Sequence, residues 1–126
     1  MRSYKNTSFR ELGAMLKYEA NIDHCRAAGS ISAPADADLI VQPGTLLTGG
    51  AAPAVFDTAA PADVTGICVT AIHIPAGQSA PIAWIDRGPI TLNSNEMDFP
   101  ADADQRAAIE TTISEMPGGI KLVAGL

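Results

Sequence analysis

The sequence from Gly66 to Leu92 reads GICVTAIHIPAGQSAPIAWIDRGPITL and decides what kind of fold the chain can adopt. Two runs rich in isoleucine, valine, threonine and tryptophan flank a segment that contains Pro75, Gly77 and Pro81. Proline cannot donate a hydrogen bond within a sheet, and glycine tolerates positive φ angles, so this segment favours a chain reversal. The pattern predicts a β-hairpin.

The first run of this hairpin is apolar on both of its faces. Side chains alternate between the two faces of a strand. An isolated hairpin is only marginally stable in water, so we expect other elements, or other copies of the chain, to cover both faces. One face is expected to carry Ile67, Val69, Ala71 and His73, and the other Cys68, Thr70, Ile72 and Ile74.

The composition is that of one small globular domain. The chain has 126 residues, of which 47% are hydrophobic and 17% charged, which is too apolar for a disordered segment. Aromatic residues make up only 5%, and a core of small side chains buries less apolar area per residue. A core of this kind leaves room for stabilisation by assembly with other chains.

The sequence indicates no membrane partner and no secretion. No run approaches the ~18 consecutive apolar residues that a membrane span needs. The first residues, MRSYKNTSFREL, lack the apolar core of a signal peptide. We therefore expect synthesis in the cytoplasm, where Cys25 and Cys68 would remain free, buried thiols.

The net charge of −6 is unevenly distributed. Residues 1–30 contain five basic and three acidic residues, whereas residues 31–126 contain three basic and eleven acidic residues. The acidic body argues against nucleic-acid binding, because a phosphate backbone requires clustered lysine and arginine. A slightly basic beginning on an acidic body suggests that the two parts have different partners.

Residues 1–30 have weak hydrophobic periodicity and are predicted to form an extended arm. We expect this arm to become ordered on contact with another molecule and to contribute little to folding. The alternative is a helix around residues 9–16 that packs on its own domain, although Gly13 would cost such a helix about 1 kcal/mol relative to alanine. The expected domains are therefore an arm, residues 1–30, and a β-rich body, residues 31–126.

Short strands separated by turns are predicted in the first half of the body. Residues 39–41 and 45–48 are expected as strands on either side of the Pro43-Gly44 turn, and residues 54–56 as a third. Several short strands at this spacing are typical of a small β-barrel or sandwich. The expected fold class is thus mainly β with one or two short helices, in a small β-barrel or β-tulip-like domain.

A helix is predicted near the C-terminus. Asp102 is a candidate N-cap, and Gln105 follows three residues later in a variant of the capping box. The Pro-Gly-Gly sequence at residues 117–119 is expected to end the helix, and residues 120–123 are expected to form a last strand. The apolar stripe of this helix would consist of Ile109, Ile113 and Met116.

No pattern in the sequence indicates catalysis, a metal site or a cofactor. Cys68 and His73 are five residues apart on one predicted strand, so they are expected on opposite faces rather than on one metal ion. Ser79 lacks the setting of a hydrolase nucleophile, since Pro81 stands where the nucleophile elbow requires glycine. We therefore expect a protein that is not an enzyme.

Two stretches in the first half of the chain match a known pattern. Gly13–Asn21, GAMLKYEAN, resembles the G-x-F-L-x-S-E-A-N run near the start of bacteriophage head decoration proteins, with Met15 in place of phenylalanine. Arg26 lies close to the position of a Ser-Arg pair in those proteins. Residues 41–47, VQPGTLL, resemble their a-G-t-v-L segment.

The second half of the chain continues the match in the same order. Residues 86–88, Asp-Arg-Gly, followed by MDFP at residues 97–100, are similar to the charged strand and L-x-W-P sequence of the family, with Phe99 in place of tryptophan. A short helix and a Gly-Ile step at residues 119–120 close the chain as they do there. The collinear order, from Gly13 to Val123, makes the chain resemble the lambda-type head decoration family.

This resemblance implies a small β-rich protein that binds the outer surface of the expanded phage head as a trimer. It further implies that the N-terminal arm engages the major capsid protein and cements neighbouring capsomers, which places the protein in the virion. The capsid-binding residues would be Leu12, Met15, Leu16, Tyr18, Glu19, Asn21 and Arg26. The predicted hairpin would contribute to the threefold interface through Ile72, Trp84, Ile85 and Arg87.

Two alternatives stay open at this point. One is a different structural component of the virion, such as a tail or connector β-protein. The other is a small-molecule-binding β-barrel with enzymatic activity.

Overall fold

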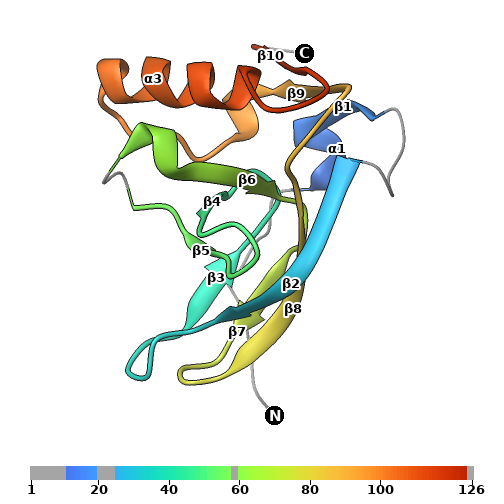
Figure 1. Cartoon of the computed structure of the whole chain (residues 1–126). Helices are drawn as coiled ribbons and strands as arrows, with labels where there is room; N and C mark the ends of the chain where they lie inside the picture. The colour runs from blue at the N-terminus through green and yellow to red at the C-terminus, as the bar shows by residue number, and fades with distance from the viewer. Residues whose placement is uncertain (1–10, 20–24, 58–59, 125–126) are drawn as a thin grey trace.

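The computed structural model describes residues 11–19, 25–57 and 60–124, and this part of the chain is mainly β, as the sequence predicts (Figure 1). The described strands form three sheets, with the orders β1-β9-β10, β2-β8-β6-β4-β5 and β3-β7. They do not close into the expected barrel. The strands are β1 (Leu16–Glu19), β2 (Arg26–Ser32), β3 (Leu39–Val41), β4 (Leu46–Thr48), β5 (Ala54–Val55), β6 (Val64–Cys68), β7 (Ile72–Ile74), β8 (Ser79–Ile85), β9 (Ile90–Asn93) and β10 (Ile120–Val123). Within the described residues, the helices whose two ends are both defined are α1 (Leu12–Met15) and α3 (Ala103–Ser114), and the 3-10 turns are η1 (Pro61–Asp63) and η2 (Ser94–Glu96).

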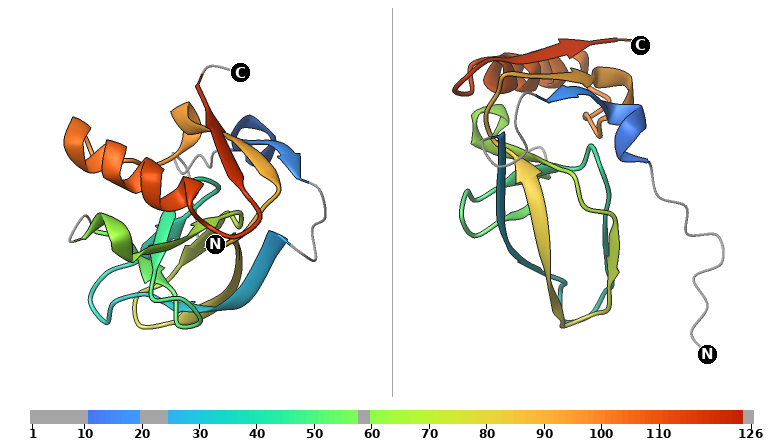
Figure 2. Two further views of the ribbon diagram at one scale, coloured as in Figure 1. Left: turned by 45° about the horizontal axis from the view of Figure 1, so that its top comes forward. Right: turned by 90° about the vertical axis from the view of Figure 1, so that its right-hand side faces the viewer.

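These elements form two stacked regions. The three-stranded sheet, α1 and α3 lie at one end of the molecule, and β2, β8, β3 and β7 extend away from them toward the other end (Figures 1 and 2). Strand β6 lies between the two regions and pairs with both β4 and β8. The stretch from Gly66 to Leu92 therefore contributes strands to both regions, with β7 and β8 in one and β9 in the other.

The predicted hairpin is confirmed in its strand pairing but not in its continuity. Strands β6 and β8 are antiparallel neighbours, with Ile67 opposite Ile85. The first run is nevertheless split, because β6 ends at Cys68 and the chain resumes as β7, which pairs with β3 in another sheet. The Thr70 hydroxyl accepts a hydrogen bond from the Ala83 N–H at 2.9 Å. This side-chain bond takes the place of a backbone bond that a continuous strand would form.

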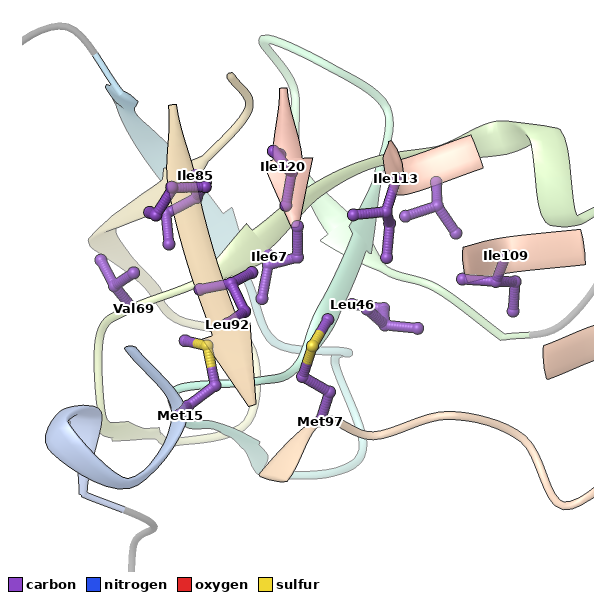
Figure 3. Packing of buried hydrophobic residues seen from close by; sticks show 12 residues of the cluster. Met15, Leu46, Ile67, Val69, Ile85, Leu92, Met97, Ile109, Ile113 and Ile120 are labelled. Carbon is purple, nitrogen blue, oxygen red and sulfur yellow. The ribbon is translucent and has the colours of Figure 1, made fainter. Parts of the chain in front are cut away.

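The expected alternation of side chains along this run is confirmed, and both faces are covered by the chain itself. Ile67 and Val69 belong to one hydrophobic cluster, and Cys68 and Ile74 belong to the other. The second cluster contains Ile31, Ala33, Val41, Leu47, Cys68, Ile74, Ile82 and Trp84. The first cluster, shown in Figure 3, contains Met15, Leu46, Val64, Ile67, Val69, Ile85, Ile90, Leu92, Met97, Ile109, Ile113 and Ile120.

The single tryptophan of the chain packs in a space that exists because two of its neighbours are glycines. Trp84 is 4% exposed. A Cβ at Gly66 would lie 2.5 Å from Trp84 Cδ1, and a Cβ at Gly29 would lie 3.0 Å from Trp84 Cη2. The indole can lie against the neighbouring backbones only because both residues lack a side chain.

The C-terminal helix forms where the sequence predicts it. Asp102 caps α3 through Oδ1, which accepts hydrogen bonds from the N–H groups of Asp104 (2.8 Å) and Gln105 (3.2 Å). The reciprocal half of a capping box is missing, since Gln105 Oε1 is buried without a hydrogen-bond partner. Ile109 and Ile113 are fully buried, which confirms the apolar stripe.

The described parts of residues 1–30 do not form a separate arm, contrary to the expected domain boundary. Met15 is 0% exposed within the first cluster. Strand β2 pairs with β8 along its whole length, from Arg26 opposite Ile85 to Ser32 opposite Ser79. Strand β8 needs this partner because β6 covers only its last residues. Residues 1–10 and 20–24 lie outside the described part of the chain.

Candidate functional site

The residues of the N-terminal region that were expected to bind a partner differ in how deeply the structure buries them. Met15 is buried in the core, and Leu12 and Leu16 are half-buried against the same cluster. Met15 is therefore wrong as a surface anchor, whereas Leu12 and Leu16 keep part of their surface exposed and stay a prediction. Tyr18 is exposed over 56% of its surface.

Glu19 and Arg26, which were expected to make polar contacts with a partner, bind each other. Arg26 donates from Nε to Glu19 Oε2 at 2.8 Å and from Nη2 to Glu19 Oε1 at 2.7 Å. The side chains of Glu19 and Arg26 are 6% and 20% exposed. Hydrogen bonding to the Glu19 carboxylate raises the pKa of Arg26, and burial opposes this shift. Such a two-point pair fixes geometry more strongly than a single contact.

This pair joins the two regions of the molecule. Glu19 is the last residue of β1 and lies opposite Ile90 in the three-stranded sheet, whereas Arg26 is the first residue of β2 and lies opposite Ile85. The expected capsid contacts at Glu19 and Arg26 are thus corrected to an internal link. Asn21 lies outside the described residues.

The outer edge of β1, the strand that carries Tyr18, has no partner among the described strands. In the three-stranded sheet β1 is a terminal strand, and its partner β9 lies on one side only. Lys17 is exposed, and its Nζ donates a hydrogen bond to the Gly13 carbonyl oxygen at 3.1 Å. The surface around β1 therefore combines an aromatic side chain, a cation and an edge strand. We call this region, residues 16–19, the β1 edge.

Two of the four expected oligomer-interface residues are part of the core. Trp84 is 4% exposed and Ile85 is 0% exposed within a single chain. The expectation for them is wrong, because Trp84 packs in the second hydrophobic cluster and Ile85 packs in the first. Ile72 is half-buried against the second cluster. Arg87 is accessible, with a side-chain exposure of 47%, and hydrogen bonding to Asp86 raises its pKa.

The cysteine and histidine side chains of the described residues are not assembled into a metal site. No group of three or more His, Cys, Asp or Glu side chains converges among residues 11–19, 25–57 and 60–124. Cys25 and Cys68 are buried free thiols. Burial raises the pKa of the Cys68 thiol to about 11, which keeps it protonated and unreactive at neutral pH.

His73 binds an aspartate that lies just before the neighbouring strand β3. Its Nε2 lies 2.7 Å from Asp38 Oδ2, and Asp38 Oδ1 accepts a hydrogen bond from the Ala76 N–H at 2.9 Å. These contacts connect the start of β3 to the turn after β7. These contacts stabilise the two-stranded sheet, so the imidazole has a structural role.

A groove between α3 and β10 is the feature that the sequence did not predict. It has a volume of about 680 Å³. The groove arises because a helix and an edge strand that follow each other in sequence lie side by side. Its lining residues are Ala107, Glu110, Thr111, Ser114, Gly119, Ile120, Lys121 and Leu122.

Among the described residues, no helix is both long enough and apolar enough to cross a membrane. No protein-family model matches the chain, and no curated protein matches it significantly.

Proposed function

We propose that this chain is a bacteriophage capsid decoration protein that binds the outer surface of the expanded head. The collinear sequence resemblance from Gly13 to Val123 is the observation that carries this proposal. The mainly β class of the fold agrees with it. A cement protein requires a rigid body and a surface for the shell, and it requires no catalytic group.

The β1 edge is the surface of this chain that best fits the major capsid protein. A free strand edge can accept an extended segment of a partner through main-chain hydrogen bonds. Tyr18 beside that edge offers a large apolar surface with a polar tip, which is a frequent anchor in interfaces. The link between Glu19 and Arg26 holds this edge in a fixed position on the body.

Three copies would bind a threefold site on the shell as a homotrimer. Linking three identical contacts raises the effective concentration of the second and third, so modest individual contacts can give avid binding. The acidic body and its basic beginning suggest that the face toward the shell and the face toward solvent differ in charge. The protein would then reside on the outside of the virion.

Co-sedimentation with shells of the phage that encodes the chain tests this proposal. The purified protein should sediment with expanded shells and remain in solution with unexpanded proheads. A protein that ignores expanded shells, or that binds both forms equally, would rule out decoration of the mature head.

A matched pair of variants tests the β1 edge. Tyr18→Asp should weaken binding to expanded shells by about tenfold or more, since each tenfold change corresponds to about 1.4 kcal/mol. Ile40→Asp places the same charge on another exposed apolar residue, 49% exposed on β3, and should leave binding unchanged. Equal losses in both variants would show that the contact lies elsewhere.

A further inference from the structure

Helix α3 extends beyond the sheet that it packs against. Strand β10 ends the order β1-β9-β10, and no described strand pairs with its other edge. Figure 2 (left) shows α3 beside β10 on the side opposite β9. The groove between α3 and β10 thus lies where a fourth strand of this sheet would lie.

The lining of the groove suits an extended segment. A fourth strand would run about 4.8 Å from β10, above the helix face that carries Ala107, Thr111 and Ser114. These side chains are short, so they leave the volume of about 680 Å³ open. The apolar side of α3 points the other way, since Ile109 and Ile113 are fully buried in the first cluster.

The groove has room for a single added strand but not for the edge strand β10 of another copy's sheet. A twofold pairing of β10 with β10 of another copy would bring two α3 helices to the same side of the joined sheet. Each helix already lies beyond its own β10, so the two would compete for the same space. A segment without a helix of its own avoids this conflict.

The charge around the groove favours a basic segment of this same chain as the occupant. Residues 1–10, MRSYKNTSFR, contain three cations and no acidic residue, and they contain neither proline nor glycine. Tyr4, Thr7 and Phe9 favour strand conformation. The lining of the groove carries one acid, Glu110, and one base, Lys121, and Glu110 pairs with Arg106 at 3.8 Å. The acidic excess lies around the lining, at Asp102, Asp104 and Glu115 on α3 and its flanking residues.

We infer that residues 1–10 of a second copy bind in this groove as a strand added to β10. The segment is followed by α1 and β1, and β1 is at the opposite edge of the same sheet. To fill its own groove, a chain would have to cross three strand spacings, about 14 Å, before it could pair with β10. A neighbouring copy can donate the segment without this detour.

Such an exchange is head-to-tail, because the donated segment and the accepting groove are different surfaces. Contacts of this kind form closed rings when the rotation permits, which suits a threefold assembly. The inference concerns contacts between copies and goes beyond the proposed binding to a shell.

The mass of the protein in solution, measured by sedimentation velocity over a range of concentrations, provides the first test. Full-length protein should associate, and protein that lacks residues 1–10 should remain a monomer. Ala107→Trp should also remain monomeric, because the indole would fill the groove. Ala108→Trp is the matched control: Ala108 is exposed on the same helix but does not line the groove, so this variant should associate normally.

A fluorescein-labelled peptide with the sequence of residues 1–10 provides the second test. Its fluorescence anisotropy should rise saturably with protein that lacks residues 1–10, and the affinity should fall by about tenfold or more in the Ala107→Trp background. A peptide that binds both proteins equally, or neither, would overturn the inference. The inference would also be overturned if full-length protein were monomeric and did not bind the peptide, since residues 1–10 would then fill the groove of their own chain.

The same variants separate this inference from the proposed function. Association in solution without binding to shells would leave the groove contact standing and remove the decoration function. Binding of shells by protein that stays monomeric in solution would leave the decoration function standing and remove the groove contact.

Discussion

The backbone of Gly88 lies directly against the backbone of Gly119, and position 88 has no room for a side chain. A Cβ on Gly88 would overlap the carbonyl group of Gly119. The Gly88 N–H donates a hydrogen bond to the Pro117 carbonyl oxygen (2.8 Å), and the Ile90 N–H donates one to the Gly119 carbonyl oxygen (3.2 Å). The loop before β9 thus holds the turn that ends α3 and begins β10, including one wall of the groove.

Gly88→Ala should destabilise the protein by about 1–3 kcal/mol, as expected when an added methyl group meets immovable backbone. Urea unfolding followed by the fluorescence of Trp84, the one tryptophan of the chain, measures the change. Gly13→Ala is the control, since a Cβ there has no neighbour within 4 Å. Equal stability of the two variants would contradict the close approach.

Glu19→Gln should cost about 3 kcal/mol of unfolding free energy, because it leaves the Arg26 guanidinium partly buried without its counter-charge. Arg87→Gln removes an exposed cation beside Asp86 and should leave the unfolding midpoint unchanged. Chemical denaturation of both variants at neutral pH decides the matter. An unchanged midpoint for Glu19→Gln would mean that the two regions are held together by packing alone.

Stability should fall as the pH rises from 9 toward 11, and Cys68 should account for part of this loss. Burial raises the pKa of this thiol from 9.0 to about 11 in the folded protein. The unfolded chain therefore loses its thiol proton first, and the folded state is disfavoured between these two values. The effect should be at most about 2–3 kcal/mol. The free energy of unfolding, measured by urea titration, should differ less between pH 8 and pH 11 in Cys68→Ala than in the parent. An equal difference in the two proteins would exclude Cys68 as the cause.

Removal of residues 1–30 should unfold the protein, whereas removal of residues 1–10 should leave it folded. The longer deletion takes away Met15 and most of β2, including the partner of β8. Met15→Ala alone should cost about 2–5 kcal/mol, the usual range for a buried large-to-small change. Circular dichroism and thermal melting distinguish the outcomes. A folded body after the longer deletion would restore the interpretation of residues 1–30 as an independent arm.

The elements that the sequence predicted correctly are those specified by neighbouring residues. The cap at Asp102 and the glycines after Pro117 lie within a few residues of the helix ends that they define. The strand at residues 39–41 is bounded by its own turn residues. Alternation placed Ile67 and Cys68 on opposite faces, because this property depends only on the geometry of one strand.

The elements that the sequence did not reveal depend on contacts between distant residues. Glu19 and Arg26 attracted interest as charged residues near the N-terminus, but only the pairing of β1 with β9 and of β2 with β8 brings them together. The sequence predicted Trp84 as an interface residue. It is buried within the chain instead, because two glycines far from it in sequence make room for its ring.

The groove exists only because α3 and β10 pack side by side at the end of a sheet. Local propensity determines where strands and helices begin and end. The partner of each strand, and hence which charged and aromatic side chains remain on the surface, is decided by the packing that covers both faces of β6 at once.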